Sequence, residues 1–202
     1  MRSIAIEREF GSGGREVGRM AAKLLDVPFY DGELLLATAE SSGIDLSRLR
    51  NFDERQAGSL LFDLSLAGNP NQYSERTSLY EMFATLQKTI RRLAGKGPAV
   101  FIGRCSTNTL SGSGDAPRAL RVFLYASDAE KRCARVMETE QVGEAEARRM
   151  IRRKDKEREQ YFRYFTQKNW ADRANYDIQL NTSTMPMQQC AELLAALARA
   201  GQ

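Results

Sequence analysis

The segment IAIEREFGSGGRE, residues 4–16, gives the clearest indication of the fold. It opens with a short apolar run and passes through charged residues into a glycine-rich turn. Apolar residues then recur at helical spacing from Val17 to Leu25, which predicts a strand, a glycine turn and a helix. Glycines let backbone N–H groups turn inward, and a helix N-terminus adds partial positive charge, so this turn suits a phosphate group. A plain turn between a strand and a helix would look the same.

Two phosphate-binding patterns can be compared with this turn. The dinucleotide pattern G-x-G-x-x-G fails, because an acceptable third glycine comes only at Gly18 and Asp31 comes too early to hold a ribose. An enzyme with a nicotinamide cofactor is therefore disfavoured. The second pattern, the P-loop G-x-x-x-x-G-K-[ST], is met in part.

The P-loop pattern fits in two registers. Counted from the strand, Arg8 takes the place of the first glycine and Gly13 that of the second, which leaves Gly14 at the lysine position. Moved by one residue, the pattern puts Arg15 at the lysine position and Glu16 at the Ser/Thr position. In either register the loop is degenerate and has a cation beside it.

Strands and helices alternate along the rest of the chain. Apolar runs bounded by turn residues predict the strands, and a 3.6-residue periodicity predicts the helices. The expected strands are 4–6, 27–30, 98–102, 120–125 and 176–180; the expected helices include 17–25, a long helix from the stop at 69–71 to Gly95 or Gly97, one capped by Asp128, 143–167 and 187–200. This alternation predicts an α/β protein, with helices on both faces of a parallel sheet.

Composition bounds the class of protein. The chain has 202 residues, an ordinary length for one domain, and a formal net charge of +4, which suits a phosphate-bearing ligand but not a histone-like binder. It has no histidine, which excludes histidine general bases, histidine-dependent nucleophiles and histidine-bound metals. The scattered Cys105, Cys133 and Cys190 predict buried free thiols. No signal peptide or membrane span is recognisable, so we expect a cytoplasmic protein.

Several short motifs follow one another in a specific order. They are Arg-Glu-Phe-Gly-Ser-Gly-Gly-Arg-Glu at 8–16, Phe-Tyr-Asp at 29–31, Ile-Gly-Arg-Cys at 102–105, an Asp155-x-x-Arg158 step in a basic helix, and Asn-Tyr-Asp-Ile-Gln-Leu-Asn-Thr at 175–182. The order of the motifs resembles that of the cytidylate kinases. The residues within the motifs resemble still more those of the cytidylate kinase-like family. The resemblance covers nearly the whole chain.

The resemblance implies the fold of the P-loop nucleoside monophosphate kinases, a three-layer α/β fold with a five-stranded parallel sheet. It implies one domain over 1–202, with a helical acceptor-binding region at about 31–96 and a helical lid at about 143–168 as inserts. The implied activity is phosphoryl transfer from ATP, with Mg²⁺, to a nucleoside monophosphate, cytidylate (CMP or dCMP) being the first choice. A monomer or dimer that binds neither membranes nor nucleic acids is expected.

The chain departs from the family pattern at three places. Arg15 is the nearest substitute for the missing loop lysine, and Glu16 is the nearest oxygen ligand for Mg²⁺ in place of the Ser/Thr. Cys105 replaces the aspartate of Gly-Arg-Asp, the residue expected to contact a pyrimidine ring.

Phosphoryl transfer needs positioning and cations rather than covalent chemistry from the protein, so arginines and lysines are the natural candidates. The predicted catalytic residues are Arg15, Arg153 and Arg158. The predicted binding residues are Gly11, Ser12, Gly13, Gly14, Arg15 and Glu16 for ATP, Glu16 for the metal, and Arg8, Asp31, Arg104 and Lys154 for the acceptor.

Other roles stay open for these residues. Asp31 caps a helix equally well, and the arginines of 143–167 can pair along the helix with Glu144, Glu146 and Glu157. The aromatic residues within 161–170 stack on bases or, more often, anchor a helix on the core. For the whole protein, the alternatives are a nucleotide-binding module with weak or no turnover, a kinase of another small acceptor and, ranked last, a nucleic-acid binder.

Overall fold

A computed structural model describes residues 1–32, 34–35, 37, 71–112 and 117–200. About half of the expected acceptor-binding region, residues 38–70, therefore lies outside the described residues. Within the described ranges, no helix is long and apolar enough to cross a membrane. Cys105, Cys133 and Cys190 are buried and free, as predicted.

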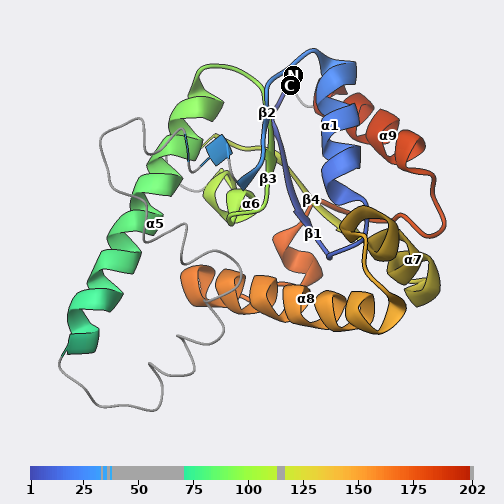
Figure 1. Ribbon diagram of the computed structural model, residues 1–202. Coiled ribbons are helices and arrows are strands. Elements are labelled where there is room, and N and C mark those ends of the chain that lie inside the picture. Colours follow the sequence, from blue (N-terminus) through green and yellow to red (C-terminus); the bar gives the residue numbers. More distant parts are fainter. Residues whose placement is uncertain (33, 36, 38–70, 113–116, 201–202) are drawn as a thin grey trace.

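Five strands form one parallel sheet in the order β2-β3-β1-β4-β5, so the predicted fold class is confirmed (Figure 1). The strands are β1 (Ile4–Arg8), β2 (Phe29–Tyr30), β3 (Val100–Ile102), β4 (Leu120–Tyr125) and β5 (Ile178–Asn181). β1 is two residues longer than the apolar run predicts, because Glu7 and Arg8 continue to pair with β4. Its end therefore carries charged residues directly into the glycine loop.

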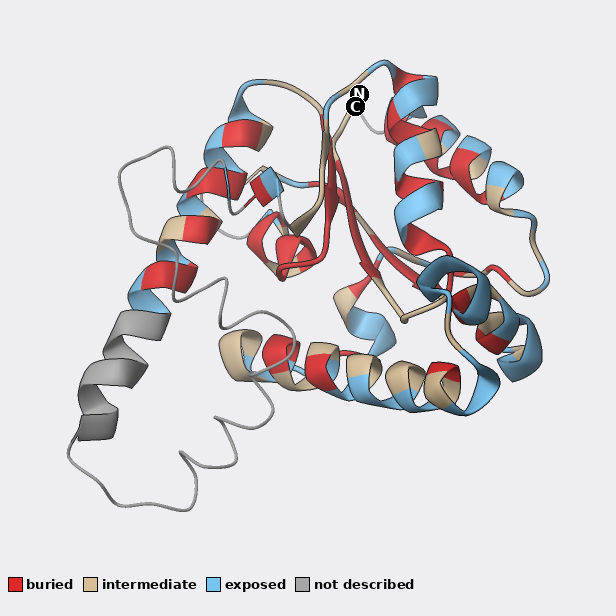
Figure 2. Ribbon diagram, in the orientation of Figure 1, coloured by how far each residue is buried: buried red, intermediate tan, exposed pale blue. Residues whose placement is uncertain are grey.

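Helices cover both faces of the sheet (Figures 1 and 2). Helices α1 (Gly14–Leu25) and α9 (Met187–Ala200) pack on one face, where Ile4 and Ile6 point. Ala5 points to the other face, as the two-residue period of a strand requires. That face is covered by α5 (Asn71–Gly95), the short α6 (Ser106–Thr109) and residues of α8 (Glu144–Thr166).

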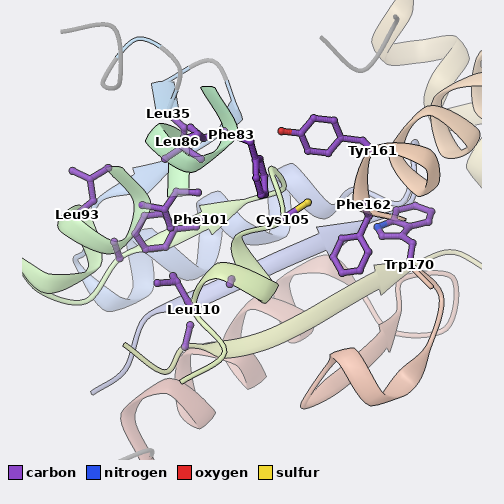
Figure 3. Close-up of a cluster of buried hydrophobic side chains, with 14 of the residues drawn as sticks. Leu35, Phe83, Leu86, Leu93, Phe101, Cys105, Leu110, Tyr161, Phe162 and Trp170 are labelled. Atoms are coloured by element: carbon purple, nitrogen blue, oxygen red, sulfur yellow. The ribbon is translucent and has the colours of Figure 1, made fainter. Parts of the chain in front are cut away.

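The second face holds the aromatic core that Figure 3 shows. Phe101 of β3 lies on one side of it with Leu86, Leu93 and Leu110, and Tyr161, Phe162 and Trp170 lie on the other side, at the C-terminal end of α8 and just after it. The predicted aromatic cluster after the basic helix is thus core packing, and it fixes the C-terminal half of α8 to the sheet.

Two helices lie beside the carboxyl ends of the strands. Helix α7 (Ala129–Glu140) begins at Asp128, whose carboxylate accepts the N–H groups of Glu130 and Lys131, so the predicted cap is confirmed. Helix α8 follows after a short turn and packs on α7 through Cys133, Val136 and Ala147. A 3₁₀ turn at Arg173–Asn175 leads into β5. Both α7 and α8 contribute side chains to the site.

Candidate active site

The candidate site lies at the carboxyl ends of β1 and β3, where open α/β sheets bind ligands. A cavity of about 510 Å³ opens there, a volume in the range of small-molecule sites. Its lining consists of Arg8, Glu9, Phe10, Gly11, Gly13, Gly14, Arg15, Glu16, Asp31, Gly32, Ile102, Arg104, Arg135, Val136, Thr139, Glu140, Lys154 and Arg158. Arginine and lysine side chains outnumber the carboxylates, so the cavity suits an anion.

The loop from β1 to α1 forms one wall of the cavity. Gly11 and Gly13 both have φ of 76°, a left-handed conformation that glycine adopts without steric cost. Helix α1 begins at Gly14, and among the described residues no side chain caps its N-terminus. The first N–H groups of α1 therefore open onto the cavity, as a phosphate-binding loop requires.

Side chains from outside the loop hold its backbone carbonyls. Hydrogen bonds run from Arg158 Nη1 to Arg8 O (3.1 Å), Arg132 Nε to Phe10 O (2.6 Å), Arg135 Nη1 to Gly11 O (2.8 Å) and Thr182 Oγ1 to Ser12 O (2.7 Å). Because the carbonyls are bonded from outside, the shape of the loop is set before a ligand arrives. The buried hydroxyl of Ser12 donates to Glu9 O (2.9 Å) within the loop, and Ser12 does not line the cavity.

Arg132 and Asp155 together hold Phe10 by both of its backbone polar groups. Asp155 Oδ1 accepts the Phe10 N–H (2.8 Å), while Arg132 donates to the Phe10 carbonyl and forms an ion pair with Asp155. Arg132 also pairs with Glu9 (Nη1–Oε2, 3.2 Å). Burial raises the pKa of Glu9, although the Ala126 N–H and Arg132 favour the ionised form. The network ties α7 and α8 to the residue just before the glycines.

A strained turn follows β3. Gly103, Arg104 and Cys105 all have positive φ, at 68°, 56° and 55°, and this conformation is costly for the two that carry a side chain. The turn directs the buried Arg104 between Gly32 and the ring of Tyr161, 5.7 Å from its guanidinium carbon. Burial raises the pKa of the Cys105 thiol well above its ordinary value; the nearby charge of Glu7 adds to this and Arg104 opposes it.

Arg15 forms an ion pair with Asp31, across the cavity mouth from the glycines. The other carboxylate oxygen of Asp31 accepts the Leu34 N–H (3.0 Å), so the predicted capping role of Asp31 is observed. Partial burial opposes ionisation of Asp31, but the Leu34 N–H, Arg15 and the nearby Arg19 outweigh it and lower its pKa. Arg15 is half exposed, with 51% of its side chain accessible.

The basic helix α8 contributes two of its predicted residues to the cavity and turns the third away. Lys154 and Arg158 line the cavity. Arg153 does not line it; this exposed side chain pairs with Glu157 (3.8 Å). Two further arginines of α8 form the pairs expected of a solvated face, Arg148 with Glu130 and Glu144, and Arg149 with Glu146.

The cavity thus gathers most of the predicted residues, and it adds four from α7 that the sequence did not single out: Arg135, Val136, Thr139 and Glu140. Their spacing after the Asp128 cap gives a weak signal, since Arg132 and Arg135 share a helix face. That this face meets the glycine loop depends on β4 lying next to β1, which no local pattern predicts.

The residues present fit a nucleotide with a magnesium ion. A polyphosphate is matched by the uncapped helix start and by the surrounding cations. Glu16, on the first turn of α1, lines the cavity. In the described part of the chain, no three potential ligands gather into a metal cage. Mg²⁺ bound with phosphates and water needs only one or two carboxylates, so one glutamate is compatible with it.

Sheet order, glycine loop and cation-lined cavity define a protein of the P-loop nucleoside monophosphate kinase type. The chain belongs to the cytidylate kinase-like family, whose model matches residues 3–184. No curated protein matches the sequence.

Solved structures agree with the fold. An uncharacterized protein from Eubacterium ventriosum is 25% identical, with a TM-score of 0.73 and coverage of 99% of both chains. TT1252 from Thermus thermophilus is 19% identical, with a TM-score of 0.52 and full coverage of both chains. The two agree with the fold of the described residues. Shikimate kinase from Acinetobacter baumannii, in complex with shikimate, is 16% identical with a TM-score of 0.49, covering 100% of this chain and 96% of its own.

Proposed function

We propose that the protein is an ATP-dependent phosphotransferase of the nucleoside monophosphate kinase kind, with cytidylate (CMP or dCMP) as its acceptor. The observation that carries this proposal is one cavity that joins the glycine loop at the end of β1 to Arg104 at the end of β3. A donor phosphate chain and an acceptor phosphate can meet there without crossing bulk water.

The donor binds at the loop. Backbone N–H groups of Gly11, Gly13 and Gly14 face the phosphates, and the positive end of α1 adds to their attraction. Arg135 and Thr139 extend the same wall along α7 and take the outer part of the donor. ATP is the expected donor on the strength of the family.

The acceptor binds at the opposite end, near Arg104, Gly32 and Asp31. A buried guanidinium forks onto a phosphate or a base edge with a fixed direction. Asp31 accepts a hydroxyl of the acceptor sugar when Arg15 turns away from it toward the phosphates. The remaining acceptor contacts belong to the proposed region 31–96, much of which lies outside the described residues.

Transfer is in line, from the terminal donor phosphate to an acceptor phosphate oxygen. The chain needs to hold both ends and to balance the charge that spreads over the equatorial oxygens. Arg15, Lys154 and Arg158 line the space between the two ends and supply that charge. Glu16 would hold a magnesium ion, which would neutralise part of the charge on the donor phosphates. The proposed lid, 143–168, would exclude water above them.

The test is a coupled assay of ADP release with each nucleoside monophosphate in turn, with calorimetric binding of ATP alongside. We expect turnover that is highest with CMP or dCMP, and an Arg104→Gln variant with acceptor KM raised about 10- to 100-fold and ATP affinity unchanged. An Arg163→Gln variant, which removes an exposed arginine outside the cavity, serves as the control. Absence of turnover with every monophosphate removes this substrate class.

A second candidate is a nucleotide-binding module with weak or no turnover. The observation in its favour is Gly14 at the lysine position of the loop. It predicts saturable ATP binding with phosphate release at background, in the wild type and in Arg15→Ala alike. A nucleic-acid binder is disfavoured because three outer arginines of α8, Arg148, Arg149 and Arg153, are paired with glutamates.

A further inference from the structure

The space where the loop lysine would begin is filled by another side chain. A Cβ atom added at Gly14 would lie 2.7 Å from Cβ of Arg8 and 2.9 Å from its Cγ. These atoms form the stem of the arginine, which cannot swing aside as the end of a long side chain can. A side chain at position 14 and an arginine at position 8 therefore exclude each other on steric grounds.

The guanidinium of Arg8 extends from that stem toward the turn after β3. A Cβ added at Gly103 would collide with Arg8 Nη1, so the guanidinium lies directly against this glycine. Arg8 lines the main cavity, and it also lines the smaller cavity beside Arg104 and Arg158. Its charge therefore lies between the glycine loop and Arg104, on the path between the two ends of the site.

Arg15, the nearest cation in the other register, lines the same cavity but forms an ion pair there. Its side chain pairs with Asp31 after β2 and is half exposed, whereas Arg8 is the last residue of the buried strand β1 and is partly covered. Of the two arginines, Arg8 is the one whose stem fills the start of the lysine's space and whose guanidinium lies against Gly103, between the loop and Arg104.

We propose that Arg8 is the phosphate-binding cation of this loop, through an exchange of two positions. The P-loop pattern has glycine at the first position and lysine after the last glycine; this chain has Arg8 at the first and Gly14 at the second. The cation is kept but enters from the strand side of the loop. The proposal deepens the proposed function and rests on it, since it assigns Arg8 to the donor phosphates.

The exchange has a chemical consequence. A guanidinium offers a planar fork that binds two phosphate oxygens at once, whereas an ammonium acts as a point charge. Arg8 can therefore hold a terminal donor phosphate by two oxygens while facing Arg104. We expect the contribution of Arg8 to be made to the phosphates and to be independent of the base.

The test is a double-variant cycle: Arg8→Gly, Gly14→Lys and the two combined. The combined variant has the full G-x-x-x-x-G-K pattern in the register counted from the strand. Binding of magnesium–ATP and of tripolyphosphate is measured by calorimetry, and unfolding of the free protein by thermal melting. Arg163→Gln is again the charge-matched control, expected to bind both probes as the wild type does.

Arg8→Gly should weaken the binding of magnesium–ATP and of tripolyphosphate about 10- to 100-fold. Gly14→Lys alone should lower the melting temperature, because the new stem meets Arg8. The combined variant should bind at least about tenfold more tightly than Arg8→Gly, and it should lose less melting temperature than the sum of the single changes.

Two results overturn the proposal. One is Arg8→Gly binding tripolyphosphate as tightly as the wild type; the other is a folded combined variant with purely additive losses. If the combined variant fails to fold, Arg8→Lys and Arg8→Gln are compared instead. Arg8→Lys should bind tripolyphosphate within about tenfold of the wild type, whereas Arg8→Gln should lose this affinity. A wild type that binds neither probe overturns the proposed function and this inference together. A wild type that binds, with Arg8 variants unchanged, overturns this inference alone.

Discussion

Two sharp turns lie at the same edge of the sheet, and they differ in which residues adopt left-handed backbone conformations and in what holds them in place. The loop after β1 uses Gly11 and Gly13 at its left-handed positions, so its backbone is unstrained, and it is held from outside by side chains of α7 and α8. The turn after β3 places Arg104 and Cys105 in the left-handed region and is held by its own neighbours.

The bonds of the second turn come from the adjacent strand β1 and from the turn itself. The Gly103 N–H donates to Ile6 O (2.8 Å), and the Ser106 N–H donates back to Gly103 O (3.0 Å). Thr109 Oγ1 donates to Cys105 O (3.0 Å). A phosphate loop needs open N–H groups and so depends on distant side chains for its shape. The turn after β3 directs one side chain, Arg104, and needs no open N–H groups. Its strained backbone can persist because the buried end of the sheet holds the turn in place.

The largest effect is expected at the outside support of the loop. Arg132→Met should destabilise the protein by about 2–4 kcal/mol, because it leaves the carboxylates of Glu9 and Asp155 without their shared cation. The change is measured by urea unfolding. Arg149→Met, which removes an exposed ion pair with Glu146, is the matched control and should cost under about 1 kcal/mol. Equal losses in the two variants would show that the loop does not depend on Arg132.

The glycines of the loop come next. Gly13→Ala should cost about 1–3 kcal/mol, since an L side chain is strained at φ of 76° and its Cβ meets the sulfur of Met187. Gly95→Ala is the control, because a Cβ there meets nothing within 4 Å and the helical position favours alanine. Urea unfolding measures both, and a neutral Gly13→Ala would contradict the role given to this glycine.

A smaller effect is expected where Arg15 and Asp31 link the two ends of the cavity. The pKa of Asp31 is lower in the folded protein than its ordinary 3.8, so its charge stabilises the fold above that value and stops doing so as pH falls through the folded pKa. Asp31→Asn keeps the cap and should cost about 0.5–1 kcal/mol at pH 7. The difference from wild type should shrink on acidification to pH 2. A gap that stays constant with pH would exclude a role for the Asp31 charge.

The smallest effect concerns the strained turn. Glycine is ordinarily less stable than alanine by about 0.5–1 kcal/mol, but at φ of 55° a side chain costs about 1–2 kcal/mol. Cys105→Gly should therefore be more stable than Cys105→Ala by about 0.5 kcal/mol, while both lose the packing of the buried thiol. Urea unfolding of the pair checks the sign. A Cys105→Ala variant more stable than Cys105→Gly would mean that the backbone of the turn relaxes at no cost in stability.

The sequence predicted the regular elements well because their signals are local. The strand at 120–125 and the helix at 187–200 have the expected bounds, and the long helix ends at Gly95. The glycine loop and the cap at Asp128 were also readable, since a turn or a cap involves residues only a few positions apart. The site was predicted as a set of residue types near that loop, and most of them line one cavity.

The α/β class and the glycine loop follow from the sequence alone, and the absence of histidine limits the candidate site residues to other types. Which cations face the cavity depends on the tertiary structure. It places Arg135 of α7 in the cavity lining, directs Arg153 outward and fills the space beside Gly14 with the stem of Arg8. The reason is that a side chain's direction follows from packing between segments far apart in the chain, here through the order β3-β1-β4. Periodicity and motif spacing depend only on residues that are near one another in the sequence.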